Sequence, residues 1–78
     1  MEENYKNILG PTIKFLRTRM GINQEEFVAL LYNEGLKIDE PMLTRIENQT
    51  RVLRDFEFVT VIKILQVDYN DFFDKVSE

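Results

Sequence analysis

The sequence contains no cysteine and no histidine. Without cysteine, the chain can form neither disulfides nor thiolate metal sites. Without histidine, it lacks the side chain that most often serves as a general base and as a zinc ligand. A glycine-rich loop of the kind that binds phosphate groups is missing as well. We therefore expect a protein that is not an enzyme and that binds neither a metal nor a cofactor.

Long apolar runs are also missing. No stretch approaches the roughly 18 apolar residues that indicate a membrane span, and the first residues, M-E-E-N-Y-K-N, lack the apolar core of a signal peptide. These absences predict a cytoplasmic protein with no membrane partner. The chain has 78 residues, of which 44% are hydrophobic. This composition predicts one small globular domain with a thin core and a stability on the order of 5 kcal/mol.

The charge of the chain is acidic in total but unevenly distributed. A net charge of −4 argues by itself against a polyanionic partner. Residues 10–54, however, hold seven basic and six acidic side chains, whereas residues 55–78 hold two basic and six acidic ones. Because affinity for DNA depends on local basic patches more than on total charge, a nucleic-acid partner remains compatible with this sequence.

Two helices are predicted in the first half of the chain, after a flexible lead-in over residues 1–7. The first helix begins between Leu9 and Pro11 and ends near Met20, with an apolar face formed by Ile13, Leu16 and Met20. The second helix covers about residues 24–34, and its buried face is predicted at Phe27, Leu30 and Leu31. Its start carries the N-x-x-E pattern of a capping box, from Asn23 to Glu26. The glycines that suit the left-handed position after each helix are Gly21 and Gly35.

The stretch from Ile38 to Arg54, I-D-E-P-M-L-T-R-I-E-N-Q-T-R-V-L-R, contains the best candidate for a binding element. It predicts a helix over about residues 40–48, since Asp39 or Glu40 can cap its start and Pro41 suits a first turn, where a missing N–H costs little. Helical spacing predicts a buried face formed by Met42, Leu43 and Ile46. The opposite face and the basic turn that follows carry the polar side chains Thr44, Arg45, Asn48, Arg51 and Arg54.

Two further helices complete the expected fold. Asp55 is predicted to cap a fourth helix, whose apolar positions are Phe58, Val61, Ile62 and Leu65. Asp68 is predicted to cap a fifth, whose apolar positions are Tyr69, Phe72, Phe73 and Val76. No stretch predicts a strand, so the expected fold is an all-α, compact bundle of five short helices in a single domain over residues 8–76.

Four motifs occur in an order that resembles a known family. They are L-G-P-T-I-K-F-L-R from Leu9, G-I-N-Q-E-E-F from Gly21, L-T-R-I-E-N from Leu43 and F-E-F-V-T-V-I-K-I-L-Q-V from Phe56. Together they resemble the lambda-repressor-like helix-turn-helix family, also called the Cro/cI or XRE type, over roughly residues 8–73. The resemblance implies a five-helix transcriptional regulator that binds double-stranded DNA, usually as a homodimer, with its third helix in the major groove.

The resemblance also implies which residues contact DNA. Gln24 matches a glutamine that contacts a phosphate at the start of the second helix, where it adds a donor to the free backbone N–H groups. The positions that face base edges are occupied by Glu40, Pro41 and Arg45. Of these, Arg45 can form a bidentate contact with guanine O6 and N7. The structural alternatives are that Gln24 only suits a first turn and that Arg45 is only a solvated charge.

Other residues match backbone contacts or an internal pair of the family. Asn48 and Arg51 match contacts with the DNA backbone after the third helix, and Arg54 adds attraction to phosphates that is independent of base sequence. Arg17 and Glu47 match an internal ion pair that ties the first helix to the third. We expect this pair to be structural, because a partly buried pair fixes geometry and is costly to break on one side.

The sequence departs from the family pattern in three places. The segment between Gln24 and the third helix is longer than in the shortest members, which leaves the geometry of the turn open. Asp39 and Glu40 stand where polar or basic residues are more usual, so Glu40 either accepts a hydrogen bond from cytosine N4 or holds this tip away from DNA. No glycine follows the third helix, so Gln49 is predicted to be strained unless the turn differs.

Two other functions are compatible with parts of the sequence. The net acidity and the acidic tip suit a protein-interaction module on the same fold, as do three aromatic residues, Tyr69, Phe72 and Phe73. Such aromatics more often belong to a core than to an interface, and they could also form a dimer contact. A metal could in principle be held by three acids, Asp68, Asp71 and Asp74. Their spacing lacks the alternate acids and central glycine of an EF-hand loop, so helix capping and solubility explain them better.

Overall fold

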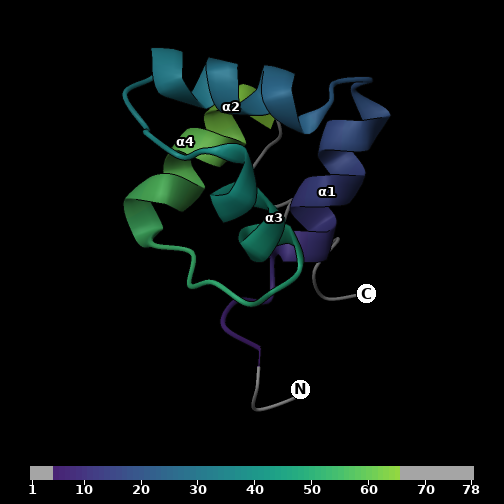
Figure 1. The fold of residues 1–78 in the computed structure, drawn as a ribbon, viewed down its shortest axis with the longest axis vertical. Helices are drawn as coiled ribbons and strands as arrows, with labels where there is room; N and C mark the ends of the chain where they lie inside the picture. The colour runs from purple at the N-terminus through teal and green to yellow at the C-terminus, as the bar shows by residue number, and fades with distance from the viewer. Residues whose placement is uncertain (1–4, 66–78) are drawn as a thin grey trace.

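The computed structural model describes residues 5–65, which form four helices (Figure 1). They are α1 (Gly10–Arg19), α2 (Gln24–Asn33), α3 (Glu40–Glu47) and α4 (Asp55–Leu65). The all-helical prediction is confirmed, since residues 5–65 contain no strand. The prediction of five helices is wrong, because the structure has four helices over the described residues. The buried apolar core of this part is built from these four helices and the α2–α3 connection. The segment predicted as the fifth helix, from Asp68 onward, lies outside the described residues.

The four helices are arranged so that α3 packs against α1 and α2, and α4 packs against the same two helices. In Figure 1, α2 lies across the top of the view, with α3 beneath it and α1 beside it. The largest fully buried side chains come from all four helices, namely Ile13, Phe27, Leu31, Leu43, Ile46 and Val61. The core is therefore continuous, and α3 contributes two of its six largest side chains.

The predicted ends of α1 and α2 agree closely with the structure. The capping box of α2 is complete, because the Asn23 side chain accepts a hydrogen bond from the Glu26 N–H and the Glu26 carboxylate accepts one from the Asn23 N–H. Gly21 and Gly35 take positive φ angles of 77° and 89°, as expected after each helix. Two residues predicted on buried faces are instead exposed, Met20 at 43% and Leu30 at 39%. Met20 is the C-cap residue that follows α1, and Leu30 lies beside the buried Phe27 and Leu31 of α2, so the apolar stripes are narrower than the spacing predicted.

The start of α3 is fixed by Asp39 and Pro41. Asp39 is the N-cap residue, and its Oδ1 accepts a hydrogen bond of 2.9 Å from the Met42 N–H. Pro41 lies in the first turn, where its missing N–H leaves no gap in the helix. The connection from α2 is held by two buried side chains, Leu36 and Ile38. The lengthened α2–α3 segment is thus an ordered part of the core.

None of the helices in residues 5–65 is long and apolar enough to cross a membrane.

Candidate nucleic-acid interface

One face of α3 is open to solvent along its whole length. The side chains of Leu43, Ile46 and Glu47 are buried, whereas the exposed residues form two adjacent rows at a spacing of four. The first row is Glu40, Thr44 and Asn48, and the second is Pro41 and Arg45. The residues that the sequence assigned to base edges therefore share this face, which we call the α3 face.

The buried side of α3 is tied to α1 by an ion pair. Arg17 Nε lies 2.8 Å from Glu47 Oε2, and Arg17 Nη2 donates to Glu47 Oε1 at 3.1 Å. The third guanidinium nitrogen donates to the carbonyl oxygen of Ile22 at 2.9 Å. Arg17 and Glu47 are only 7% and 5% exposed. The pair is thus present as the resemblance implied, and each guanidinium nitrogen and both carboxylate oxygens are hydrogen-bonded, as a buried pair requires.

Gln24 joins the same network from α2. Its Nε2 donates to Glu47 Oε1 at 3.1 Å, and its Oε1 accepts a hydrogen bond of 3.1 Å from the Thr44 hydroxyl. The sequence had assigned Gln24 to a phosphate and Thr44 to the open face of the helix. In the structure, one of the two amide N–H groups of Gln24 and the hydroxyl donor of Thr44 are used between α2 and α3. Gln24 therefore links the two helices, whatever else it contacts.

Three polar side chains of the α3 face are not used inside the fold. Within residues 5–65, the side chains of Glu40, Arg45 and Asn48 are exposed and take part in no hydrogen bond or ion pair. Arg45 stands near the middle of the face with its guanidinium unneutralised. The hydrogen-bonding capacity of the face is therefore concentrated in these three groups.

The turn after α3 adopts the strained geometry that the missing glycine predicted. Gln49 has a φ of 68°, and the turn is closed by hydrogen bonds from the Gln49 N–H to the Ile46 oxygen and from the Thr50 N–H to the Arg45 oxygen. A left-handed residue other than glycine is unfavourable. Here it is held by the N-terminal segment, because Lys6 N donates to the Gln49 oxygen at 2.9 Å and Gln49 Nε2 donates to the Asn7 oxygen at 3.1 Å.

Asn7 is the main residue that the sequence reading missed. Its Nδ2 donates to the carbonyl oxygens of Ile46, at 3.1 Å, and Arg51, at 2.7 Å. Its Oδ1 accepts hydrogen bonds from the N–H groups of Leu9 and Gly10, at 2.9 and 2.7 Å. One side chain thus caps the start of α1 and fastens the end of α3 to it. An asparagine shortly before the Gly-Pro at the start of a helix was the available signal, but residues 1–7 were interpreted as a flexible lead-in.

Gly10 allows α1 and α3 to approach each other at the same place. A Cβ atom at this position would overlap the carbonyl oxygen of Ile46 and lie 2.9 Å from that of Glu47. Both are backbone atoms and cannot rotate away. The orientation of the α3 face is therefore set at the C-terminal end of α3, by backbone contact with α1 and by the Arg17–Glu47 pair.

The two arginines after α3 differ in how they are used. Arg51 makes a bidentate pair with Glu57, with two N–O distances of 3.1 Å, and also donates to the Val52 oxygen. The Arg54 backbone N–H donates to the same carboxylate at 2.9 Å, while its side chain is exposed and makes no hydrogen bond or ion pair within residues 5–65, although its charge acts on Glu57. Of the two arginines assigned to phosphates, Arg54 has the exposed guanidinium without an ion pair in the described part, and Arg51 stabilises the start of α4.

Glu57 is a buried carboxylate whose pKa is lowered. Burial alone would raise the pKa, but hydrogen bonds from the Arg51 side chain and the Arg54 N–H, together with the charges of both arginines, outweigh that effect. Glu57 is therefore ionised in the folded protein at neutral pH, and the turn between α3 and α4 depends on its charge.

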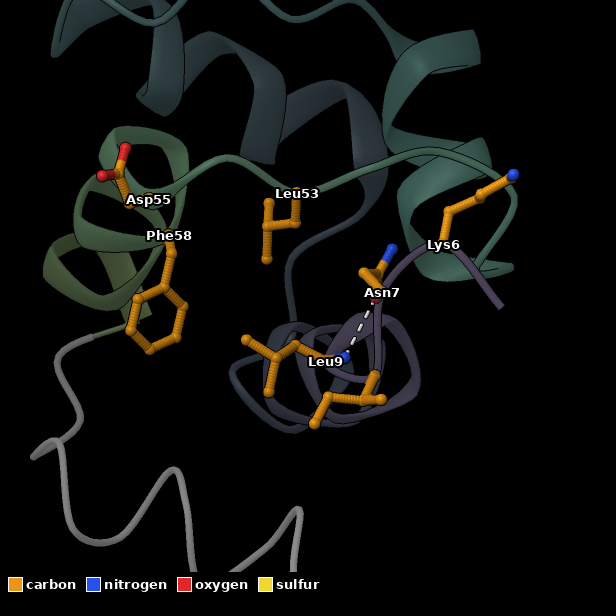
Figure 2. Close-up of a pocket in the computed structure, with 7 residues that line it drawn as sticks. Lys6, Asn7, Leu9, Leu53, Asp55 and Phe58 are labelled. Carbon is orange, nitrogen blue, oxygen red and sulfur yellow. Dashed lines mark hydrogen bonds between the residues drawn. The ribbon is translucent and has the colours of Figure 1, made fainter. Parts of the chain in front are cut away.

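A separate hollow of about 350 Å³ lies between the N-terminal segment, the α3–α4 connection and α4. Figure 2 shows Leu9, Leu53 and Phe58 around this space, with the charged ends of Lys6 and Asp55 directed away from it. It shares no residue with the α3 face.

No protein-family model, curated protein or solved structure matches the chain.

Proposed function

We propose that the protein is a sequence-specific DNA-binding regulator that reads the major groove with the α3 face. The observation that carries this proposal is the guanidinium of Arg45, which has no ion pair within residues 5–65 and lies on an exposed helix face whose opposite side is packed into the core. The helix has eight residues and is therefore about 12 Å long. Its diameter with side chains, about 10–12 Å, fits the width of the major groove, which is roughly 12 Å.

In this proposal Arg45 reads guanine, because its planar fork matches the O6 and N7 acceptors of that base. Asn48 and Arg54 lie at the C-terminal end of α3 and beyond it, where they contact phosphates and fix the register of the helix. The buried network holds the backbone of α3 in place before DNA arrives, so the conformational freedom lost on binding is limited to exposed side chains such as that of Arg45. The four motifs that resemble the lambda-repressor-like family support the same function, with two copies of the chain on two half-sites.

The test is selection of duplexes from a randomised pool, followed by fluorescence anisotropy from about 50 to about 200 mM salt. Several phosphate contacts should make affinity fall steeply over this range. Arg45→Ala should reduce discrimination against a site with one substituted base pair by about 1–3 kcal/mol. Arg19→Ala is the matched control, since Arg19 is exposed on α1 away from the α3 face. It removes the same charge and should change affinity for all duplexes alike.

Failure to enrich any duplex at low salt would contradict the proposal. An unchanged site preference in Arg45→Ala would show that Arg45 does not read a base.

A second candidate function, a protein-interaction module, is favoured by three exposed apolar side chains outside the α3 face, Val52, Phe56 and Val59. Flat, weak binding to every duplex, together with a protein partner whose affinity survives Arg45→Ala, would favour that alternative.

A further inference from the structure

Glu40 is the remaining charged group of the α3 face, and its carboxylate is free. It is the first residue of α3, it is exposed, and within residues 5–65 it accepts no hydrogen bond. Its neighbour Asp39 is used differently, because the Asp39 carboxylate caps the helix by accepting from the Met42 N–H at 2.9 Å. The two acids at this tip therefore have separate tasks, and only Glu40 keeps its acceptor capacity for an outside donor.

The side chains of residues 41–44 offer no free donor and no charged acceptor. The Pro41 side chain has no hydrogen-bonding group. The Thr44 hydroxyl, one turn after Glu40 in the same row, already donates to Gln24 Oε1. Since the N-terminal residues of a recognition helix are those that reach base edges, Glu40 is the polar group that meets the bases at this end of α3.

We infer that Glu40 accepts a hydrogen bond from the N4 amino group of a cytosine, so that the half-site contains this cytosine in addition to the guanine read by Arg45. The inference rests on the proposed DNA-reading function and names the class of site it recognises. Glu40 and Arg45 are five residues apart, about 7.5 Å along the helix axis, so both contacts fall within one half-site.

The chemistry of the groove selects cytosine. An ionised carboxylate only accepts hydrogen bonds. Guanine presents two acceptors to the major groove, thymine presents an acceptor and a methyl group, and adenine places the N7 acceptor beside its amino group. Cytosine presents an amino donor and no acceptor of its own, since the adjacent O6 acceptor belongs to the paired guanine. A glutamate at this position is repelled by phosphates on every duplex, and only a cytosine compensates that repulsion. Glu40 therefore raises specificity by weakening binding to other sites.

Glu40→Gln tests the inference directly. A glutamine both donates and accepts, and it pairs with adenine N6 and N7. We expect the wild-type protein to prefer cytosine at one position by roughly five- to twenty-fold, the lower part of the range for a base contact, because a carboxylate accepts from a single amino group. In Glu40→Gln the preference at that position should change to adenine. The measurements are selection from a randomised pool and anisotropy on four duplexes that differ only at that base pair.

Glu25→Gln is the matched control. Glu25 is also exposed in the first turn of a helix, but it lies on α2 and outside the α3 face. The Glu25→Gln substitution removes the same charge as Glu40→Gln, and it should alter affinity for all four duplexes equally while keeping the preference for cytosine. Circular dichroism of both variants checks that the fold is unchanged, as expected for exposed side chains.

Three outcomes are distinguishable. A change from cytosine to adenine in Glu40→Gln alone supports the inference. An enriched wild-type site whose base preferences are the same in Glu40→Gln, or are altered equally by Glu25→Gln, overturns the inference and leaves the proposed function standing. If the wild-type protein enriches no duplex, both the function and the inference are overturned.

Discussion

Substitution of Gly10 by alanine should destabilise this protein, although helix propensity alone predicts the opposite. Glycine within a helix is less favourable than alanine by roughly 1 kcal/mol. Gly10 lies in α1 and does not have a positive φ angle, so alanine is conformationally allowed there. Local rules therefore predict a small gain in stability for Gly10→Ala.

The contact between α1 and α3 reverses this expectation. The added Cβ would overlap the Ile46 carbonyl oxygen and crowd the carbonyl group of Glu47, all of them backbone atoms. Overpacking of a well-packed contact costs about 1–3 kcal/mol, and a backbone obstacle belongs at the upper end. After the gain in helix propensity is subtracted, we expect a net loss of about 2 kcal/mol, out of a total on the order of 5 kcal/mol.

A urea titration followed by far-ultraviolet circular dichroism measures this loss, and it suits a chain without tryptophan. For a domain of this size the dependence of the unfolding free energy on urea is about 1 kcal/mol/M, so the midpoint should fall by about 2 M. The control is Lys14→Ala, one turn later in α1 at an exposed position, which should change stability by less than about 0.5 kcal/mol. A midpoint for Gly10→Ala equal to or above that of the wild type would refute the reasoning.

Two further predictions concern the C-terminal end of α3 and the turn that follows it. Asn7→Ala removes four hydrogen bonds and leaves the Ile46 and Arg51 carbonyl oxygens without this donor, so we expect the unfolding free energy to fall by about 2–3 kcal/mol in the same urea titration. The control Asn33→Ala, at the exposed end of α2, should be nearly neutral. Equal midpoints for the two variants would show that the Asn7 contacts contribute little. Because folding lowers the pKa of Glu57, the stability that this carboxylate contributes is present above the pKa it has in the unfolded chain and is lost as the pH falls through the lowered, folded value. The difference in unfolding free energy between the wild type and Glu57→Gln should therefore shrink on going from about pH 6 to about pH 3, and a difference independent of pH would contradict the assigned charge.

The sequence predicted the local features of the fold well, because they depend on residues close together in the chain. The bounds of α1–α3, the start of α4 at Asp55, the capping box at Asn23 and the positive φ of Gly21 and Gly35 all follow from patterns within a few positions. Periodicity was less reliable at the edges of faces. It placed Met20 on a buried stripe, but this residue ends α1 in an exposed position.

The features that orient α3 could not be predicted in the same way. Asn7 contacts carbonyl oxygens 39 and 44 positions away, and the obstacle that requires glycine at position 10 comes from α3. No local pattern encodes such distances. Only the Arg17–Glu47 pair, also far apart in sequence, was anticipated, and the resemblance to a known family supplied it rather than the spacing of charges.

The candidate site can bind a ligand only through polar groups that are not already hydrogen-bonded inside the fold. Every buried side-chain polar atom in the described part has a hydrogen-bond partner. Arg51, which the sequence assigned to phosphates, is among the groups used, and its alanine variant would lower stability as well as any DNA affinity. Arg45 and Glu40 make no such contacts, so their variants report on recognition without this complication. A loss of DNA affinity in an Arg51 variant is therefore informative only after its stability has been measured, whereas a changed base preference in an Arg45 or Glu40 variant identifies a contact directly.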